Sequence, residues 1–221
     1  MPSKTFGVII PAAGSGNRFG ADKLMFDLCG KPVLWHTLSA FQAAETVSFI
    51  VIPTRAENIS VVRELAAPFS KVIAVVSGGE TRQESVTRGL AALPAVDYVS
   101  VHDGARPLIL PREIDRLHEE AIRYGGVSDA LPVVDTSQQV DAQGFVVHTP
   151  DRAFLMAAAT PQIFESSLYR VACERAVGAC FTDDAGMVMV NGVSMSIFCP
   201  VAKPANASCW KASLKVMLVF T

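Results

Sequence analysis

The chain has 221 residues, of which 50% are hydrophobic and 18% are charged, and its formal net charge is -2. This composition supplies enough apolar surface for a sizeable core and excludes a disordered chain. The nearly balanced charge excludes a broad basic surface, so no nucleic-acid partner is expected and any site for an anion must be local.

Two further features bear on location. The five cysteines, at positions 29, 173, 180, 199 and 209, show no C-x-x-C spacing, so neither a disulfide framework nor a zinc site is indicated. The first residues lack the apolar segment of a signal peptide, and no apolar run reaches the ~18 residues that a membrane helix needs. We therefore expect a cytoplasmic protein without a membrane partner.

Strands and helices are expected to alternate along the chain. Short apolar runs predict strands, and apolar residues at helical spacing predict helices. The expected strands are 6–10, 48–52, 72–76, 98–102 and 194–198, and the expected helices are 31–44, 58–65 with Asn58 as its cap, 82–93, 111–124 and 165–176. This alternation predicts an α/β fold in a single domain, residues 1–221. Its doubly wound, mostly parallel, Rossmann-like sheet would be covered on both faces.

Ligands of such sheets bind outside the carboxyl ends of the strands, so the loops after strands are of interest. The loop after the first strand combines small residues with two cations: Pro11, Ala12, Ala13, Gly14, Gly16, Arg18 and Lys23. Glycines let a backbone approach a ligand closely, and the freed N–H groups can form an anion site. Backbone donors beside two positive charges suit a polyphosphate.

Other interpretations of this loop remain open. A dinucleotide-binding G-x-G-x-x-G motif fits at Gly14 and Gly16, but Phe19 takes the place of the third glycine. The P-loop pattern G-x-x-x-x-G-K-[ST] is absent. A structural strand-to-helix turn is the remaining alternative.

Two more polar loops follow later strands. The segment 78–85 joins Gly78 and Gly79 to Arg82 and Ser85, and such a place can hydrogen-bond the flat edge of a base; a glycine turn before a capped helix is the alternative. The segment 102–107 places an aspartate, a glycine and an arginine after the fourth strand, where an exposed loop salt bridge of little energetic value is the alternative. The histidine at its start is interpreted as a strand-end residue without a chemical role.

Residues 135–152 differ in character from the alternating core. The turn signal Asp141–Gly144 lies between apolar arms, which predicts an inserted β-hairpin. A two-stranded hairpin alone is marginal in water, so we expect this arm to pack on another subunit. A solvated hairpin with ordinary polar residues is the alternative.

Five motifs in chain order resemble one enzyme family. The string A-A-G-S-G-N-R-F-x-x-D-K at 12–23 is similar to a signature of sugar-nucleotide and polyol-phosphate cytidylyltransferases, and it is followed by G-G-x-x-R-x-x-S at 78–85, H-D-G-A-R-P at 102–107, T-P-Q-x-F at 160–164 and T-D-D-A at 182–185. Over residues 6–198 the chain resembles the 2-C-methyl-D-erythritol 4-phosphate cytidylyltransferase family. It departs from that pattern at Phe19, where methionine is usual, at Asp22–Leu24, where Pro-Lys-Gln is usual, and in the tail 199–221.

The resemblance implies that CMP is transferred from CTP to 2-C-methyl-D-erythritol 4-phosphate with release of pyrophosphate, in the non-mevalonate route to isoprenoid precursors. It implies Mg²⁺ as cofactor and a homodimer in which the arm reaches the partner's site. The catalytic residues would be Arg18 and Lys23. The nucleotide-binding residues would be Pro11, Ala12, Ala13, Gly14, Gly16, Gly78, Gly79, Arg82, Ser85, Asp103 and Gly104. The acceptor-binding residues would be Asp103, Arg106, Thr136, Arg152, Thr160 and Thr182.

Several functional questions stay open at the level of sequence. A ribitol-5-phosphate cytidylyltransferase has the same fold with a different polyol, and a non-catalytic nucleotide-binding module is an alternative of another class. A dehydrogenase is disfavoured because the segment Ile52–Thr54 offers no acid for a ribose. No metal ligand is identified. Lys203, Lys211 and Lys215 are all candidates for the lysine with which this family binds the acceptor.

Overall fold

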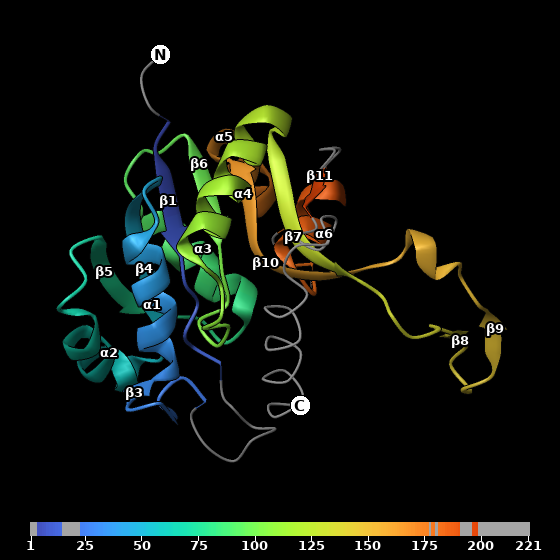
Figure 1. The fold of residues 1–221 in the computed structure, drawn as a ribbon, viewed down its shortest axis with the longest axis horizontal. Coiled ribbons are helices and arrows are strands. Elements are labelled where there is room, and N and C mark those ends of the chain that lie inside the picture. The colour runs from blue at the N-terminus through green and yellow to red at the C-terminus, as the bar shows by residue number, and fades with distance from the viewer. Residues whose placement is uncertain (1–3, 15–22, 177, 180, 191–195, 199–221) are drawn as a thin grey trace.

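A central sheet organises the molecule. The computed structural model describes residues 4–14, 23–176, 178–179, 181–190 and 196–198. Seven strands form one sheet in the order β11-β7-β10-β6-β1-β4-β5 (Figure 1). Their bounds are β1 Phe6–Ile9, β4 Val47–Thr54, β5 Val72–Ser77, β6 Tyr98–Val101, β7 Gly126–Pro132, β10 Met156–Glu165 and β11 Ser196–Phe198.

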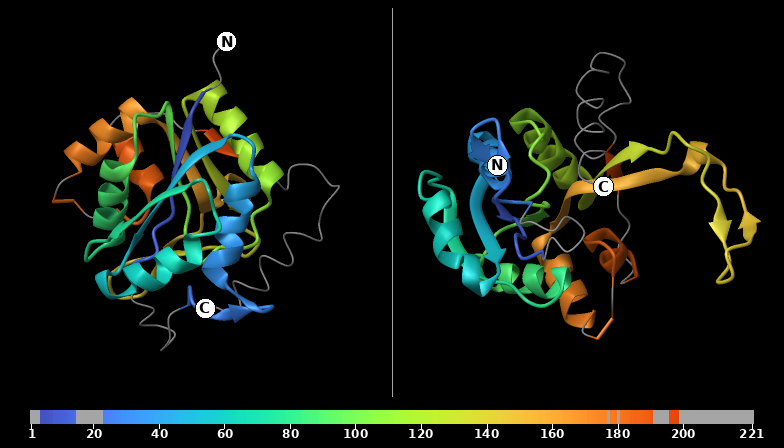
Figure 2. Two further views of the ribbon diagram at one scale, coloured as in Figure 1. Left: turned by 90° about the vertical axis from the view of Figure 1, so that its left-hand side faces the viewer. Right: turned by 90° about the horizontal axis from the view of Figure 1, so that it is seen from below.

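Helices cover both faces of the sheet, as Figure 2 shows. Their bounds are α1 Val33–Ala43, α2 Ile59–Ala66, α3 Arg82–Ala92, α4 Pro111–Tyr124, α5 Ser166–Arg175 and α6 Asp184–Val190, with short 3₁₀ turns η1 Ala56–Asn58 and η2 Arg152–Phe154. Alternate strand residues point to opposite faces. Val8 and Ile10 accordingly pack in a core with α1, α2 and α4, whereas Ile9 packs with α3, α5 and α6. The predicted doubly wound α/β sheet is confirmed.

The sheet is mostly parallel, with one reversed strand. Strands β1, β4, β5 and β6 pair in parallel, and β11 pairs in parallel with β7. Strand β10 lies between β6 and β7 and is antiparallel to both. The chain leaves β7 at its carboxyl end and returns without a crossover helix, so β10 re-enters the sheet from that same edge. The antiparallel direction brings Thr160 beside the loop that follows β6.

Some predicted boundaries need correction. Helix α4 has the predicted bounds, and Leu110 N–H donates to Glu113 Oε2 at 3.0 Å before its first turn. Asn58, by contrast, makes no capping hydrogen bond with its side chain, because a 3₁₀ turn already leads into α2. Strand β7, which contains Ala130, begins at Gly126. No described helix is long and apolar enough to cross a lipid bilayer.

The segment predicted as an arm lies apart from the sheet. Strands β8 (Gln139–Val140) and β9 (Val146–His148) pair antiparallel, and Gly144 adopts a positive φ of 90° in the turn that joins them. Asp141 Oδ1 accepts hydrogen bonds from Gln143 N–H and Phe145 N–H, which closes the turn. Figure 1 shows this pair of strands projecting well to one side of the body of the chain.

Candidate functional site

The segment after β1 is held against the end of β4. Ala12 N–H donates to the Pro53 carbonyl at 2.7 Å, and the Thr54 hydroxyl donates to the Ala12 carbonyl at 3.2 Å. These bonds continue the parallel register beyond the strand and fix Pro11–Gly14 at the carboxyl edge of the sheet. Two predicted site residues, Gly16 and Arg18, lie outside the described residues. Lys23 resumes the described chain and is half-buried.

The second predicted loop packs against the first. Gly78 N–H donates to the Thr54 carbonyl at 2.6 Å. A Cβ added at Gly78 would lie 2.7 Å from the Ala13 Cβ and 2.9 Å from Ser85 Oγ, so only glycine fits between the two loops. Close packing of protein on protein is therefore one physical reason for this glycine.

The hydroxyl of Ser85 is used within its own loop. It donates to the Thr81 carbonyl at 2.9 Å and accepts from Gly79 N–H at 3.0 Å, and the residue is 1% exposed. Thr81 caps α3, since its side chain accepts from Glu84 N–H. Ser85 thus supports the glycine turn, and its predicted contact with a nucleotide stays a prediction.

The third loop, after β6, contacts the loop after β1, helix α1 and strand β10. Gly104 N–H donates to the Pro11 carbonyl at 3.4 Å, and the Thr37 hydroxyl donates to the Gly104 carbonyl at 2.9 Å. Asp103 N–H donates to Thr160 Oγ1 at 3.2 Å. The loops after β1, β5 and β6 and the middle of β10, at Thr160, therefore meet at one edge of the sheet.

His102 is a structural residue of this edge, as predicted. Its ring is fully buried, and Nε2 lies 3.1 Å from the Arg106 carbonyl, which it meets as a donor. Burial lowers the pKa of His102 to about 4, so the ring is neutral near pH 7. The neutral, buried ring thus holds the Asp103–Arg106 turn through its hydrogen bond to the Arg106 carbonyl.

Two arginines share the carboxylate of Asp103. Arg82 Nε lies 3.2 Å from Oδ1, and Arg106 Nε lies 3.1 Å from Oδ2. Burial alone would raise the pKa of Asp103, but the two guanidinium groups outweigh it and hold that pKa below its ordinary value. The carboxylate is thus ionised and joins the α3 side of the site to the β6 side.

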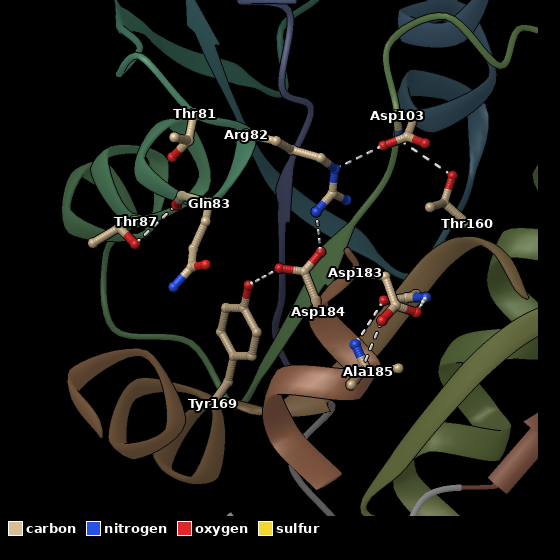
Figure 3. Close-up of polar contacts among 12 residues, drawn as sticks. Thr81, Arg82, Gln83, Thr87, Asp103, Thr160, Tyr169, Asp183, Asp184 and Ala185 are labelled. Carbon is tan, nitrogen blue, oxygen red and sulfur yellow. Dashed lines mark hydrogen bonds and ion pairs between the residues drawn. The ribbon is translucent and has the colours of Figure 1, made fainter. Parts of the chain in front are cut away.

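Arg82 also reaches a second carboxylate (Figure 3). Its Nη1 lies 2.6 Å from Asp184 Oδ2, and the Tyr169 hydroxyl donates to Asp184 Oδ1 at 2.6 Å. Burial would lower the pKa of Arg82, but the carboxylates of Asp184 and Asp103 outweigh burial and raise that pKa above its ordinary value. The side chain is therefore a permanent cation. The N-terminus of α3 is in this way tied to α6 and α5.

Asp183 caps the N-terminus of α6. Asp183 Oδ1 accepts from Gly186 N–H at 3.0 Å, and Gln162 donates from Nε2 to Asp183 Oδ2 at 2.9 Å. Gln162 Oε1 accepts from Ala185 N–H, which attaches the helix to β10. Thr182 precedes this cap and is exposed, whereas Thr160 is buried.

Comparison with known proteins assigns this arrangement to a family. The family profile of the 2-C-methyl-D-erythritol 4-phosphate cytidylyltransferases (IspD) matches residues 6–200. The chain belongs to this family. It is therefore a CTP-dependent cytidylyltransferase, one of the nucleotidyltransferases.

Relatives of that name cover most of the chain. The protein of Prochlorococcus marinus (strain MIT 9313) is 42% identical over 204 residues, which are 90% of this chain and 90% of the relative. The protein of Dehalococcoides mccartyi (strain ATCC BAA-2266 / KCTC 15142 / 195) is 41% identical over 195 residues, covering 87% and 86%.

Solved structures share the fold. The 2-C-methyl-D-erythritol 4-phosphate cytidylyltransferase from Thermus thermophilus is 27% identical, covers 97% of this chain and 98% of its own, and gives a TM-score of 0.72. The 4-diphosphocytidyl-2C-methyl-D-erythritol synthase from Anaerococcus prevotii DSM 20548 gives a TM-score of 0.81 over 97% of this chain and 99% of its own, at 24% identity. The second likeness shows the fold alone.

Two of the predicted acceptor-binding residues belong to the arm. Thr136 and Arg152 lie at the two ends of the arm of this cytidylyltransferase and are exposed. Arg152 Nη1 donates to the Val134 carbonyl at 2.8 Å, which braces the base of the arm. Figure 1 shows β8 and β9, which these two residues flank, projecting away from the body of the chain.

The residues of this edge offer few ligands for a metal ion. The described residues contain no group of three or more histidine, cysteine, aspartate or glutamate side chains that could hold a metal ion. Mg²⁺ in nucleotide enzymes is bound by one or two carboxylates together with substrate phosphates and water. Asp103 offers one ionised carboxylate at this edge. The residues present therefore fit an ion that arrives with the triphosphate.

Sequence reasoning missed several residues that build the site. Tyr169, Asp184 and Gln162 were assigned no role of their own, and neither was Arg88, which donates to the Gly78 carbonyl at 2.5 Å. The sequence did contain a signal for Asp184. A helix start needs one acid as a cap, so a second acid beside it is available for another partner. Tyr169 carried none, because a buried aromatic looks like core.

Proposed function

We propose that the interlocked loops at the carboxyl edge of β1, β5 and β6 transfer CMP from CTP to 2-C-methyl-D-erythritol 4-phosphate and release pyrophosphate. One observation carries the assignment of residues: in a chain of this family, Pro11–Gly14, Gly78–Gly79 and the Arg82–Asp103–Arg106 cluster meet at a single edge. Open α/β sheets bind their ligands at this edge. The reaction supplies a precursor for isoprenoid biosynthesis.

The chemistry is an in-line displacement at the α-phosphorus of CTP. An oxygen of the acceptor's phosphate forms the new bond to that phosphorus, and the bond to the bridging oxygen breaks, so that pyrophosphate leaves with the electron pair. No general base is needed, because a phosphate monoester has its second pKa near ~6 and is mostly ionised at neutral pH. The barrier instead comes from two anions that repel one another.

Positive charge and backbone donors lower this barrier. Arg18 and Lys23 stabilise the charge that moves to the leaving pyrophosphate, and the backbone of the Gly14–Gly16 segment cradles the triphosphate. Gly78 and Gly79 lie beside the cytosine, with Arg82 at the start of α3. Arg106 and Thr160 approach the phosphate of the acceptor, together with Thr182.

Mg²⁺ is proposed as the cofactor. When bound, the ion neutralises negative charge on the triphosphate oxygens. Asp103 is the candidate protein ligand, because its carboxylate is ionised and stands among the nucleotide loops. The two arginines that share this carboxylate keep its charge compensated while no nucleotide is present.

The enzyme is proposed to act as a homodimer through the arm. Six apolar side chains of the arm and its base are more than half exposed: Val134, Val140, Phe145, Val146, Val147 and Phe154. A partner subunit would remove this apolar surface from water. The same contact would bring Thr136 and Arg152 to the partner's site. The free thiols of Cys29 and Cys173 suit a reducing compartment, which supports a cytoplasmic location.

Pyrophosphate release tests the proposal. The chain is incubated with CTP, Mg²⁺ and either 2-C-methyl-D-erythritol 4-phosphate or ribitol 5-phosphate, and pyrophosphate is measured by a coupled assay. Rapid release is expected with 2-C-methyl-D-erythritol 4-phosphate and not with ribitol 5-phosphate. Preference for ribitol 5-phosphate would contradict the acceptor assignment, and CTP binding without release from either acceptor would indicate a non-catalytic nucleotide-binding module.

A further inference from the structure

A buried carboxylate stands behind Arg82 with each oxygen on a different partner. Asp184 is 4% exposed and belongs to the first turn of α6. Its Oδ2 accepts from Arg82 Nη1 at 2.6 Å, and its Oδ1 accepts from the hydroxyl of Tyr169 at 2.6 Å. Figure 3 shows the three side chains in line, converging from α3, α6 and α5.

This arrangement is a poor means of stabilising a core. Burying the charge of Asp184 carries a desolvation cost, and apolar residues of similar volume often serve stability as well or better. Tyr169 is fully buried against Phe164, with ring centroids 4.8 Å apart, and a phenylalanine would keep that packing. The hydroxyl adds the bond to Asp184 and a contact with the thiol of Cys173. The polar atoms therefore point to a task other than packing.

The geometry of Arg82 indicates that task. Its Nε lies 3.2 Å from Asp103 Oδ1 while its Nη1 is held by Asp184, so two carboxylates fix the guanidinium plane from two sides. Arg82 is the first residue of α3, directly after the Gly78–Thr81 turn. The orientation of this cation between the glycine turn and the Asp103 loop thus depends on a residue that lies behind it.

We infer that Asp184, itself oriented by the Tyr169 hydroxyl, is a positioning residue that sets the Arg82 guanidinium for nucleotide binding. The inference rests on the proposed function, in which Arg82 borders the nucleotide. Asp184 lies two residues after Thr182, a proposed acceptor-binding residue. The bond to Arg82 therefore also joins the loop before α6 to the nucleotide-binding segment 78–85. Without it, Asp103 is the remaining ion-pair partner of Arg82 among the described residues, and the guanidinium group is less restrained.

Two conservative variants test the inference. Tyr169→Phe removes one hydroxyl and keeps the ring, and Asp184→Asn keeps the shape and removes the charge. Each is expected to raise the KM and the Kd for CTP by about 10-fold, because a hydrogen bond to a charged group is lost or weakened, and to change kcat less than twofold. Tyr98→Phe is the matched control. Tyr98 is also buried and stacks on Phe6, but it is the first residue of β6 and lies at the opposite end of that strand from the Asp103 loop.

A merely structural role gives a different result. It would lower Tm in both variants while the KM and the Kd for CTP stay at the values of the unmodified protein, and that outcome overturns the inference. If Asp184→Asn fails to fold, Tyr169→Phe carries the test. In an Arg82→Ala background, Tyr169→Phe is expected to have no further effect on CTP affinity, and additive losses would also overturn the inference.

Failure of the proposed function can be told apart. Absence of pyrophosphate release by the unmodified chain would remove the assigned reaction, whereas CTP titrations of the same variants by calorimetry would still measure the positioning role. An active unmodified chain with unchanged CTP binding in both variants would remove the inference alone.

Discussion

Gly78 and Ala13 lock two loops of the site together. A Cβ on Gly78 would come within 2.7 Å of the Ala13 Cβ, and the Thr54 carbonyl lies 3.3 Å from the same point. We predict that Gly78→Ala forces the loops apart and lowers the free energy of unfolding by about 1–3 kcal/mol, as overpacking does. Urea unfolding measures the loss, and a rise in the KM for CTP should accompany it. Unchanged stability would show that the loops give way easily.

Gly14 provides the contrasting case. Among the described residues, no atom outside its chain neighbours lies within 4 Å of the position that its Cβ would take, and its φ is not in the left-handed region. Gly14→Ala should therefore leave the unfolding midpoint unchanged. If the triphosphate approaches this backbone, the added methyl group weakens CTP binding. A titration that gives unaltered CTP affinity would argue against a phosphate cradle at this position.

Removal of either loop cation should damage the transfer itself. Lys23→Ala and Arg18→Ala are each expected to lower kcat by about 10²–10³-fold, because a charge aimed at the leaving pyrophosphate is lost. Lys4→Ala is the control: Lys4 pairs with Asp97 at 2.9 Å beside the start of β1, far along the strand from the site. Turnover is measured by pyrophosphate release under saturating substrates. Near-normal turnover in both loop variants would defeat their catalytic assignment.

The arm can be tested by complementation between two inactive chains. Arg152→Ala and Lys23→Ala are each expected to be inactive as pure dimers. In a mixed dimer with twofold symmetry, one site has an intact Lys23 and receives an intact Arg152 from the other subunit. Random exchange at equal concentrations should thus restore activity at about one quarter of the sites. Subunit exchange without any recovery would show that Arg152 acts within its own chain, or not at all.

The free energy of unfolding should fall in mild acid because of a buried histidine. His118 stacks on Phe6 with ring centroids 3.9 Å apart, and its Nδ1 lies 2.6 Å from the Thr46 hydroxyl. Within the part of the chain that the structure describes, its Nε2 has no hydrogen-bond partner. Burial outweighs the nearby carboxylate of Asp115 and lowers the pKa of His118 to about 3. The unfolded chain binds this proton below a pH of about 6.5, whereas the folded chain does not.

Protonation therefore favours the unfolded state as the pH falls from about 6.5 toward 3. Urea unfolding at pH 7, 6 and 5 should show this loss, and His118→Gln should flatten the slope. The residual slope is expected from His102, whose pKa is also lowered by burial, less an opposing contribution from Asp129, whose pKa burial raises to about 7. His148→Gln, on the exposed arm, should leave the slope unchanged. An unaltered slope in His118→Gln would mean that the ring gains its proton in the folded state.

The sequence was sufficient where neighbouring residues make the decision. Strands β1, β4, β5 and β6 are apolar runs between helices, so the alternation alone predicted the parallel core. The spacing of Gly78, Arg82, Asp103 and Arg106 within their motifs led to the family, and the chain belongs to it. The turn at Asp141–Gly144 was also readable, because turn residues act locally.

Tertiary structure alone decided how these parts act on one another. Arg82 and Asp184 are 102 residues apart in sequence, and no local pattern reveals that Asp184 faces Arg82 while Asp183 caps the helix. The reversal of β10 and the inward use of the Ser85 hydroxyl are likewise invisible to periodicity. The physical reason is that a local pattern fixes which face of an element is apolar, whereas the partner of a buried polar group is fixed only when distant elements pack and exclude water.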